Sequence, residues 1–247
     1  MKLTYTIPTL TPYVDWSYFY FAWGVKADQP EAAEIRAEGE RLMHHLSLNG
    51  VVARAALEIY DAYSDGDDIV LTKPEAYRLS FLRQQHTRPD TPCLCLSDFI
   101  APQGYADADH VADRIGLFAT TVSASHECPC CTGDPLLMQT VKDRLAEAAA
   151  ELLNRDFPGI RPAVGYPSLP DQSFIFDLAH LLPFDELGIH LTENGMMQPH
   201  ASTCGLIFAH PAARYFSVGP VADDQLADYA RRRGTSSERL RKFLPKH

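Results

Sequence analysis

Residues 159–167 read Gly-Ile-Arg-Pro-Ala-Val-Gly-Tyr-Pro, the most informative stretch of the chain. Proline presets its own backbone angle and biases the residue before it toward extended geometry, whereas glycine lets the backbone approach a ligand closely. An arginine held on such a segment suits bidentate capture of a carboxylate or a phosphate. The same pattern also fits a surface turn with a solvated arginine, because proline and glycine mark turns in most proteins.

Composition bounds the classes of protein to consider. The chain has 247 residues, of which 46% are hydrophobic and 22% are charged, as in ordinary globular proteins. Its formal net charge is −10, so no basic excess exists to neutralise a nucleic-acid backbone, and we expect no nucleic-acid partner. No apolar run approaches the length of a bilayer span, and residues 1–12 lack a signal-peptide core. We therefore expect a cytoplasmic protein with no membrane partner, whose cysteines are mostly reduced.

Three helices are indicated by capping residues and apolar spacing. The first runs from Pro30 to Leu48 and stops at Asn49-Gly50, because proline suits a first turn and glycine ends helices. The second runs from Asp134 to about Asp156, with Asp134 as its cap. The third spans 223–233 and is followed by a capping-box spacing at 235–238, which predicts a short final helix.

Short apolar runs predict strands at 51–60, 69–72, 93–101, 115–122, 203–209 and 215–218. A turn at 64–68 joins the first two. The strands cluster, with helices between them, and do not alternate regularly with helices, which favours an α+β fold over a doubly wound sheet. No linker divides the chain, so we predict a single domain over residues 1–247.

Common cofactor motifs are absent. No Gly-x-Gly-x-x-Gly follows a strand, no phosphate-binding loop ends in Gly-Lys-Ser/Thr, and no His-Glu-x-x-His occurs. The run from His126 to Cys131 contains soft ligands for zinc or copper, but it lacks the paired Cys-x₂-Cys spacing of structural zinc sites. We therefore predict no metal site, and a metal–thiolate protein built on this loop is kept as an alternative.

Two further places carry charge near apolar groups. Arg144 and Glu147 are three residues apart, so they are neighbours on one face of the second predicted helix. They could form a solvated ion pair or belong to a ligand site. Asp15 follows Tyr13 and precedes Trp16, where it could cap a turn or bind an ammonium group.

A set of segments, in order, resembles the S-adenosylmethionine-binding activation domain of cobalamin-dependent methionine synthase. The resemblance extends from about Tyr13 to Leu244, and Arg-Pro-Ala-x-Gly-Tyr-Pro is its most specific part. The segments are Tyr13-Val14-Asp15-Trp16, Leu82-Arg83-Gln84-Gln85, residues 96–102, residues 143–148, residues 159–167, Leu191-Thr192-Glu193 and residues 228–232.

The resemblance implies a mainly antiparallel, twisted central sheet flanked by helices, and a site for S-adenosylmethionine. Arg161 is expected to contact the carboxylate of that ligand, with Asp15 and Glu147 near its ammonium end and Arg144 supporting them. Backbone at Ala163 and Gly165 would lie against the ligand, with the rings of Tyr166 and Tyr215 beside it. Asp171 and Gln172 occupy the place where the family has a Glu-His pair that faces the corrin.

The implied function is reactivation of the synthase by reductive methylation of cob(II)alamin to methylcobalamin. The cobalamin is carried by the partner, and its cobalt is the nucleophile, so no catalytic residue is expected in this chain. We expect a stand-alone component of methionine synthase that acts in trans on the cobalamin-binding domain of a synthase lacking this domain. Flavodoxin or an equivalent reductase would supply the electron. The alternatives are a module that binds or senses S-adenosylmethionine without a catalytic role, or a reactivator of another corrinoid protein.

Overall fold

The computed structural model describes residues 1–104, 113–123 and 134–245, and the chain forms two compact units. Unit 1 comprises Met1–Leu57, Phe118–Asp156 and Leu182–Thr203. Unit 2 comprises Glu58–Leu117, Phe157–Leu181 and Cys204–His247. The expectation that residues 1–247 form one domain stays a prediction.

Most strands belong to one sheet, in the order β4-β3-β2-β5-β8, and β1 also pairs with β2. The printed registers of β1 with β2, β2 with β3 and β3 with β4 are all antiparallel. The bounds are β1 (Lys2–Thr6), β2 (Val52–Asp65), β3 (Asp68–Lys73), β4 (Tyr77–Ser80), β5 (Asp113–Ser123) and β8 (Ser202–Phe208). A separate pair joins β6 (His190–Leu191) to β7 (Met197–Gln198). The α+β prediction is confirmed.

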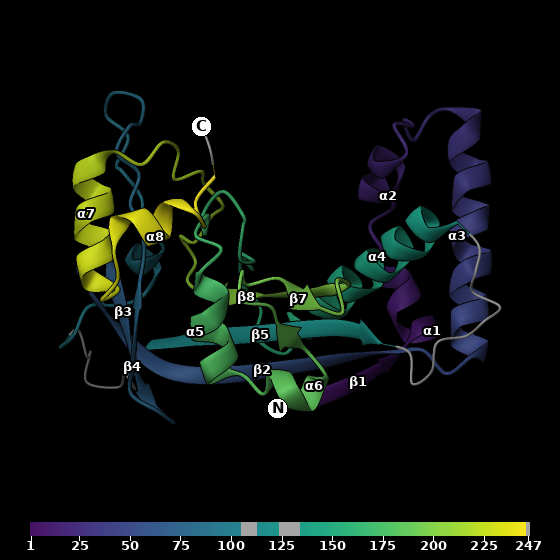
Figure 1. The fold of residues 1–247 in the computed structure, drawn as a ribbon, viewed down its shortest axis with the longest axis horizontal. Helices are drawn as coiled ribbons and strands as arrows, with labels where there is room; N and C mark the ends of the chain where they lie inside the picture. Colours follow the sequence, from purple (N-terminus) through teal and green to yellow (C-terminus); the bar gives the residue numbers. More distant parts are fainter. Residues whose placement is uncertain (105–112, 124–133, 246–247) are drawn as a thin grey trace. The chain divides into compact units, whose positions relative to one another are not determined.

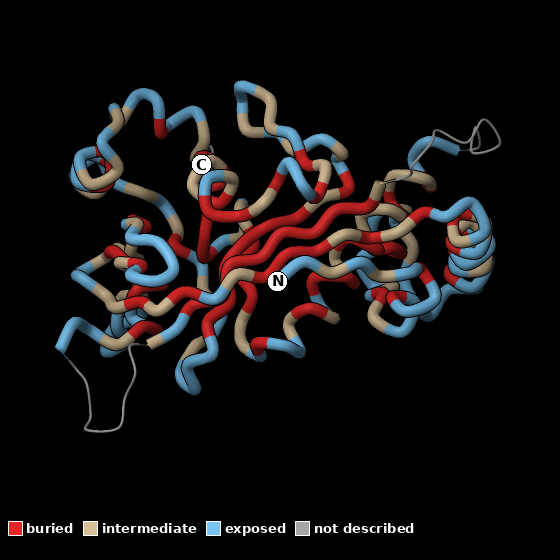
Figure 2. The backbone as a smooth tube through the Cα atoms, turned by 90° about the horizontal axis from the view of Figure 1, so that it is seen from below, coloured by how far each residue is buried: buried red, intermediate tan, exposed pale blue. Residues whose placement is uncertain are grey.

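The sheet is buried along its central strands, which Figure 2 draws largely in red. β5 is buried without interruption from Ile115 to Val122. A strand covered on both faces reads as a continuous apolar run, and for this reason the 115–122 run predicted it well. At the turn from β2 to β3, Gly66 has a φ of +61°, an angle that glycine adopts without strain.

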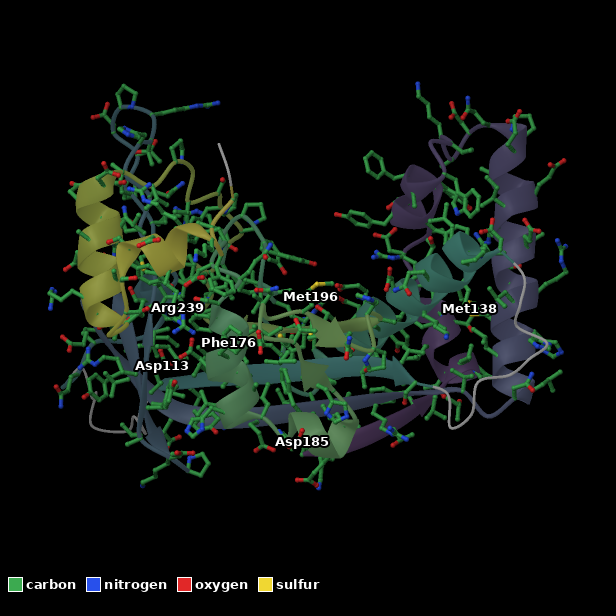
Figure 3. All side chains as sticks on the ribbon, viewed as in Figure 1. Asp113, Met138, Phe176, Asp185, Met196 and Arg239 are labelled. Carbon is green, nitrogen blue, oxygen red and sulfur yellow. The ribbon has the colours of Figure 1, made fainter. Side chains whose placement is uncertain are left out.

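Unit 1 contains the N-terminal helices and the helix that follows β5. The bounds are α1 (Ile7–Leu10), η1 (Thr11–Tyr13), α2 (Trp16–Ala22), α3 (Pro30–Leu48), α4 (Pro135–Leu153) and α6 (Phe184–Leu187). The predicted helices from Pro30 and from Asp134 are confirmed, and Asp134 caps α4 through its carboxylate. α2, α3 and α4 lie together in Figure 1, and Met138 of α4 packs against their shared core (Figure 3).

Unit 2 contains η2 (Leu96–Phe99), α5 (Phe174–Leu181), α7 (Asp223–Arg232) and α8 (Ser237–Arg241). α7 and α8 lie side by side in Figure 1, which confirms the two C-terminal helices. The cap of α8 is Ser236, whose hydroxyl accepts a hydrogen bond from the amide of Arg239. Phe176, labelled in Figure 3, packs edge-on against Phe243 with ring centroids 6.0 Å apart.

Two strand predictions are wrong. The 93–101 run contains the 3₁₀ helix η2, because the Asp98 carboxylate accepts the amide of Cys95 and is held by Arg83 at 2.7 and 2.8 Å. The 215–218 run has no regular structure, since the side chain of Gln84 and the carbonyl of Pro167 supply its hydrogen-bond partners. In both places tertiary polar contacts decide the backbone, and an apolar run does not reveal them.

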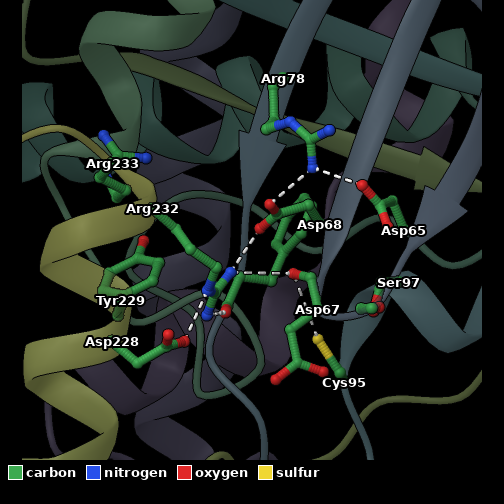
Figure 4. A network of polar contacts seen from close by, with 12 residues as sticks. Asp65, Asp67, Asp68, Arg78, Cys95, Ser97, Asp228, Tyr229, Arg232 and Arg233 are labelled. Carbon is green, nitrogen blue, oxygen red and sulfur yellow. Dashed lines mark hydrogen bonds and ion pairs between the residues drawn. The ribbon is translucent and has the colours of Figure 1, made fainter.

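A buried carboxylate joins α7 to the β2–β3 turn (Figure 4). Asp68 is 3% exposed and pairs with Arg78, at 2.9 Å, and with Arg232. Arg232 also donates to the carbonyl of Phe81 at 2.8 Å and pairs with Asp228. A buried charge is tolerated when ion pairs and hydrogen bonds satisfy it in this way, so the network specifies where α7 packs within unit 2.

The motif segment, residues 159–167, lies antiparallel to β8 within unit 2. Bridges join Ile160 to Phe208 and Ala163 to Gly205. Leu206 donates to the carbonyl of Pro162 at 3.0 Å, so the pairing continues past that proline, whose nitrogen has no hydrogen to donate in return. A Cβ on Gly159 would lie 2.2 Å from the carbonyl oxygen of Phe208, and only glycine permits this approach.

The close approach makes Gly159→Ala strongly destabilising. Because backbone must shift to admit the methyl group, we expect the free energy of unfolding to fall by about 3 kcal/mol. The matched control is Gly50→Ala, where φ is +72° and no atom lies within 4 Å of the added Cβ. There we expect a loss of about 1 kcal/mol from backbone strain alone. Urea denaturation measures both, and equal losses would contradict the packing described for Gly159.

Candidate functional site

The residues predicted for the ligand site divide between the two units. Unit 1 holds Asp15, Arg144 and Glu147. Unit 2 holds the others, which are Arg161, Ala163, Gly165, Tyr166, Asp171, Gln172 and Tyr215. Each group is described within its own unit.

A tight turn follows Ala163 in the motif segment. The amide of Tyr166 donates to the carbonyl of Ala163 at 3.0 Å, and the amide of Leu169 donates to that of Tyr166 at 2.8 Å. Gly165 has a φ of +90°, is exposed, and donates to the carbonyl of Leu169 at 2.9 Å. A left-handed residue with no neighbour within 4 Å of its Cβ position leaves backbone open to a ligand.

Arg161, Tyr166 and Tyr215 come together beside this turn. The backbone amide of Arg161 donates to the hydroxyl of Tyr215 at 2.8 Å, across 54 residues of sequence. The rings of Tyr166 and Tyr215 lie 6.5 Å apart, tilted by 47°. Arg161 is 9% exposed and Tyr215 is 56% exposed. The backbone of a buried arginine is therefore joined to an exposed aromatic side chain, and an arginine with aromatic rings nearby suits a ligand that carries both an anionic group and a flat or cationic one.

A cavity of about 730 Å³ adjoins the motif segment within unit 2. Gly165 and Pro167 line it on one side, and Ser217, Leu226 and Arg241 contribute from the C-terminal part. Its volume falls in the range of roughly 300–1,000 Å³ that is typical of small-molecule sites. Its lining is mostly apolar, with a hydroxyl and a guanidinium as polar groups, so it suits a ligand with a flat apolar portion.

Asp171 and Gln172 differ in exposure although they are neighbours. Asp171 is 1% exposed, accepts the hydroxyl proton of Tyr229 at 2.8 Å and lies 3.7 Å from Arg233. Its carboxylate therefore points into unit 2. Burial, together with the charge of Asp171, raises the pKa of Tyr229 well above 10, so that the hydroxyl keeps its proton. Gln172 is exposed, and its backbone amide donates to the carbonyl of Phe243 at 3.1 Å.

In unit 1, Asp15 immediately precedes α2 and Arg144 lies on α4. The carboxylate of Asp15 accepts hydrogen bonds from the amide and hydroxyl of Ser17 at 2.9 and 2.5 Å, so it is the helix cap that the sequence allowed. The guanidinium of Arg144 lies 5.4 Å from the ring centroid of Tyr18, an exposed aromatic of α2. Glu147 is half-buried one turn further along α4. Burial raises the pKa of the neighbouring Asp143 carboxyl.

Within the described ranges, no cluster of three or more His, Cys, Asp or Glu side chains could hold a metal ion. The cysteine-rich loop at 126–131 lies outside the described residues. In the part of the chain that the structure covers, no helix is both long and apolar enough to cross a bilayer.

Two polar side chains that lie beside the predicted site residues were not among the predictions. Gln84 donates from its side-chain amide to the carbonyl of Ser217 at 2.8 Å, although Gln84 lies far from Tyr215 in sequence. The Leu-Arg-Gln-Gln run at 82–85 was a visible signal, but nothing in it indicated which segment it contacts. Tyr18 is the second, and its signal was its position three residues after Asp15, on a short helix that spacing alone did not predict.

Known proteins match the chain both in sequence and in structure. The sequence model of a family described as vitamin B12 dependent methionine synthase, activation domain, matches residues 6–157 and 151–234. A crystal structure of the MetH reactivation domain bound to AdoHcy is similar to the chain, with 28% sequence identity and a TM-score of 0.83. That similarity covers 98% of this chain and 88% of the solved one.

Proposed function

The chain belongs to the family of vitamin B12-dependent methionine synthase activation domains, and from this premise we propose that it binds S-adenosylmethionine and supports the reductive methylation of cob(II)alamin. The observation that carries the proposal is the hydrogen bond from the amide of Arg161 to the hydroxyl of Tyr215. It joins the backbone of Arg161, in the motif segment, to the aromatic side chain that the resemblance assigned to the ligand. The AdoHcy bound to the similar MetH domain supports the same choice of ligand.

The chemistry of S-adenosylmethionine matches what unit 2 offers. The guanidinium of Arg161 would bind the ligand carboxylate through charge-assisted hydrogen bonds. The ring of Tyr215 would lie beside the sulfonium, which a π-face attracts. Backbone at Ala163 and Gly165 and the adjoining cavity would receive the adenosine, with the ring of Tyr166 closing over it.

The remaining assignments rest on the resemblance. The assignment of Asp15 and Glu147 to the ammonium end of the ligand, with Arg144 supporting them, stays a prediction of that resemblance. Of Asp171 and Gln172, we propose that Gln172 is the residue that faces the corrin. Gln172 is exposed, whereas the buried carboxylate of Asp171 is hydrogen-bonded to Tyr229.

The cobalamin, carried by a partner domain, supplies a cobalt that becomes nucleophilic once reduced and takes the methyl group. One electron from flavodoxin or an equivalent reductase, plus the methyl of S-adenosylmethionine, converts cob(II)alamin to methylcobalamin and releases S-adenosylhomocysteine. The residues of this chain bind and orient the methyl donor, which lowers the barrier by fixing the approach of the reacting atoms. We propose that the client is the cobalamin-binding domain of a methionine synthase lacking this domain, reached in trans.

Replacing Arg161 tests the ligand assignment. Arg161→Ala removes the charged partner of the carboxylate, and we expect S-adenosylhomocysteine to bind about 30-fold more weakly in calorimetry, as the loss of a charge-assisted hydrogen bond implies. The control is Arg231→Ala, which removes an arginine whose side chain is 73% exposed and pairs with Asp228. It should bind like the wild type, and equal affinity of the Arg161 variant would reject the assignment.

Reconstitution tests the trans reaction. The 247-residue protein, S-adenosylmethionine and a reductant are added to a truncated synthase loaded with cob(II)alamin, and methylcobalamin formation is followed by absorbance. We expect methylcobalamin to form at least tenfold faster with the protein than without it, because the methyl donor is held at an effective concentration. Tight binding of S-adenosylmethionine without any acceleration would favour the sensing alternative instead.

A further inference from the structure

Residues 214–222, here called the tyrosine segment, carry Tyr215 but have no regular structure. Backbone groups outside helices and sheets still need hydrogen-bond partners. The amide of Val218 donates to the carbonyl of Pro167 at 2.9 Å, which ties the tyrosine segment to the end of the motif segment. The amide of Ala222 donates to the side chain of Gln85 at 2.8 Å. The position of Tyr215 therefore depends on contacts from elsewhere in unit 2.

Gln84 supplies the contact nearest to Tyr215. Its side-chain amide donates to the carbonyl of Ser217 at 2.8 Å, while its side-chain oxygen accepts the amide of Leu94 at 3.0 Å. Its own backbone amide donates to the carbonyl of Leu94 at 2.9 Å. A primary amide both donates and accepts, so glutamine can bridge two backbone segments that share no ladder.

Gln84 and the motif segment each hydrogen-bond to the tyrosine segment, at adjacent residues. Ser217, held by Gln84, precedes Val218, held by Pro167. Two residues earlier, the hydroxyl of Tyr215 accepts the amide of Arg161. Ser217 and Pro167 also line the cavity beside Gly165. A shift of Ser217 would thus move the ring of Tyr215.

We propose that Gln84 is a positioning residue of the ligand site, which holds the tyrosine segment so that Tyr215 stays against Arg161. The inference rests on the proposed function, because it concerns the same ligand site. Gln84 itself would not touch the ligand. Its effect on affinity would pass entirely through the tyrosine segment.

The test compares two chemically matched substitutions. Gln84→Glu removes the donor to Ser217 and keeps the acceptor of Leu94. Gln225→Glu makes the same change at a neighbouring place, because Gln225 donates to the carbonyl of Arg83 at 2.9 Å and accepts its amide at 2.9 Å. Each variant loses one hydrogen bond of one kind, so similar losses of thermal stability are expected.

Calorimetry with S-adenosylhomocysteine then separates an effect on the position of Tyr215 from a general loss of stability. Gln84→Glu should weaken binding roughly fivefold, whereas Gln225→Glu should change it less than about twofold. In a Tyr215→Ala background, Gln84→Glu should change affinity less than about twofold, because the group it positions is gone. A fivefold loss in that background, or equal losses for the two glutamate variants, overturns the proposal.

Amide hydrogen exchange provides a readout that needs no ligand. Peptides covering residues 214–222 should exchange faster in Gln84→Glu than in Gln225→Glu. The amide of Val218 is protected only while Gln84 holds the tyrosine segment in place. If Gln84→Glu does not fold, Gln84→Met replaces it in both measurements with the same expectations. Wild-type protein that binds no S-adenosylhomocysteine overturns the proposed function and this inference together. Wild-type binding with unchanged affinity and exchange in Gln84→Glu overturns only this inference.

Discussion

The backbone pairing between the motif segment and β8 is the contact on which the ligand site of unit 2 depends. It is possible because Gly159 has no side chain where the carbonyl of Phe208 approaches. The pairing holds Ile160 and Ala163 against β8. Arg161 lies between them in sequence, and its backbone amide donates to the hydroxyl of Tyr215. A rigid element thus places the cation, which is how precise binding groups are usually held.

Polar contacts then hold the irregular parts of unit 2 around that element. The carboxylate of Asp171 accepts a hydrogen bond from the hydroxyl of Tyr229 and lies near Arg233. Residues at the end of α7 therefore hold the chain just after the motif segment. Burial alone would lower the pKa of Arg233, but the carboxylates of Asp177 and Asp171 raise it overall, and the guanidinium stays charged. Asp68 likewise forms an ion pair with Arg232, the last residue of α7. Buried charges of this kind are stable only as complete sets, so they specify one arrangement.

The sequence predicted elements whose determinants are local. Pro30 and the Asn49-Gly50 stop defined α3, and Asp134 with Pro135 defined the start of α4. It did not predict η2 or the course of the tyrosine segment, because Arg83 and Gln84 act there through tertiary contacts. β1 and α2 were also missed, since short elements near a terminus carry too few residues for a periodic signal.

The candidate site was predictable only in part for the same reason. The family resemblance named Arg161 and Tyr215, but spacing alone does not bring together residues 54 positions apart. The burial of Asp171 depends on Tyr229 and Arg233, which no local pattern connects to it. Side chains that bind a ligand can be recognised in a sequence motif, whereas the side chains that position them can be recognised only in the structure.

A crystal structure of the protein with S-adenosylhomocysteine tests the central claim most directly. The ligand carboxylate should lie within about 3.2 Å of the guanidinium of Arg161, with the adenosine against Gly165 and the ring of Tyr215. Ligand density elsewhere, with the side chain of Arg161 making no contact to it, would contradict the account.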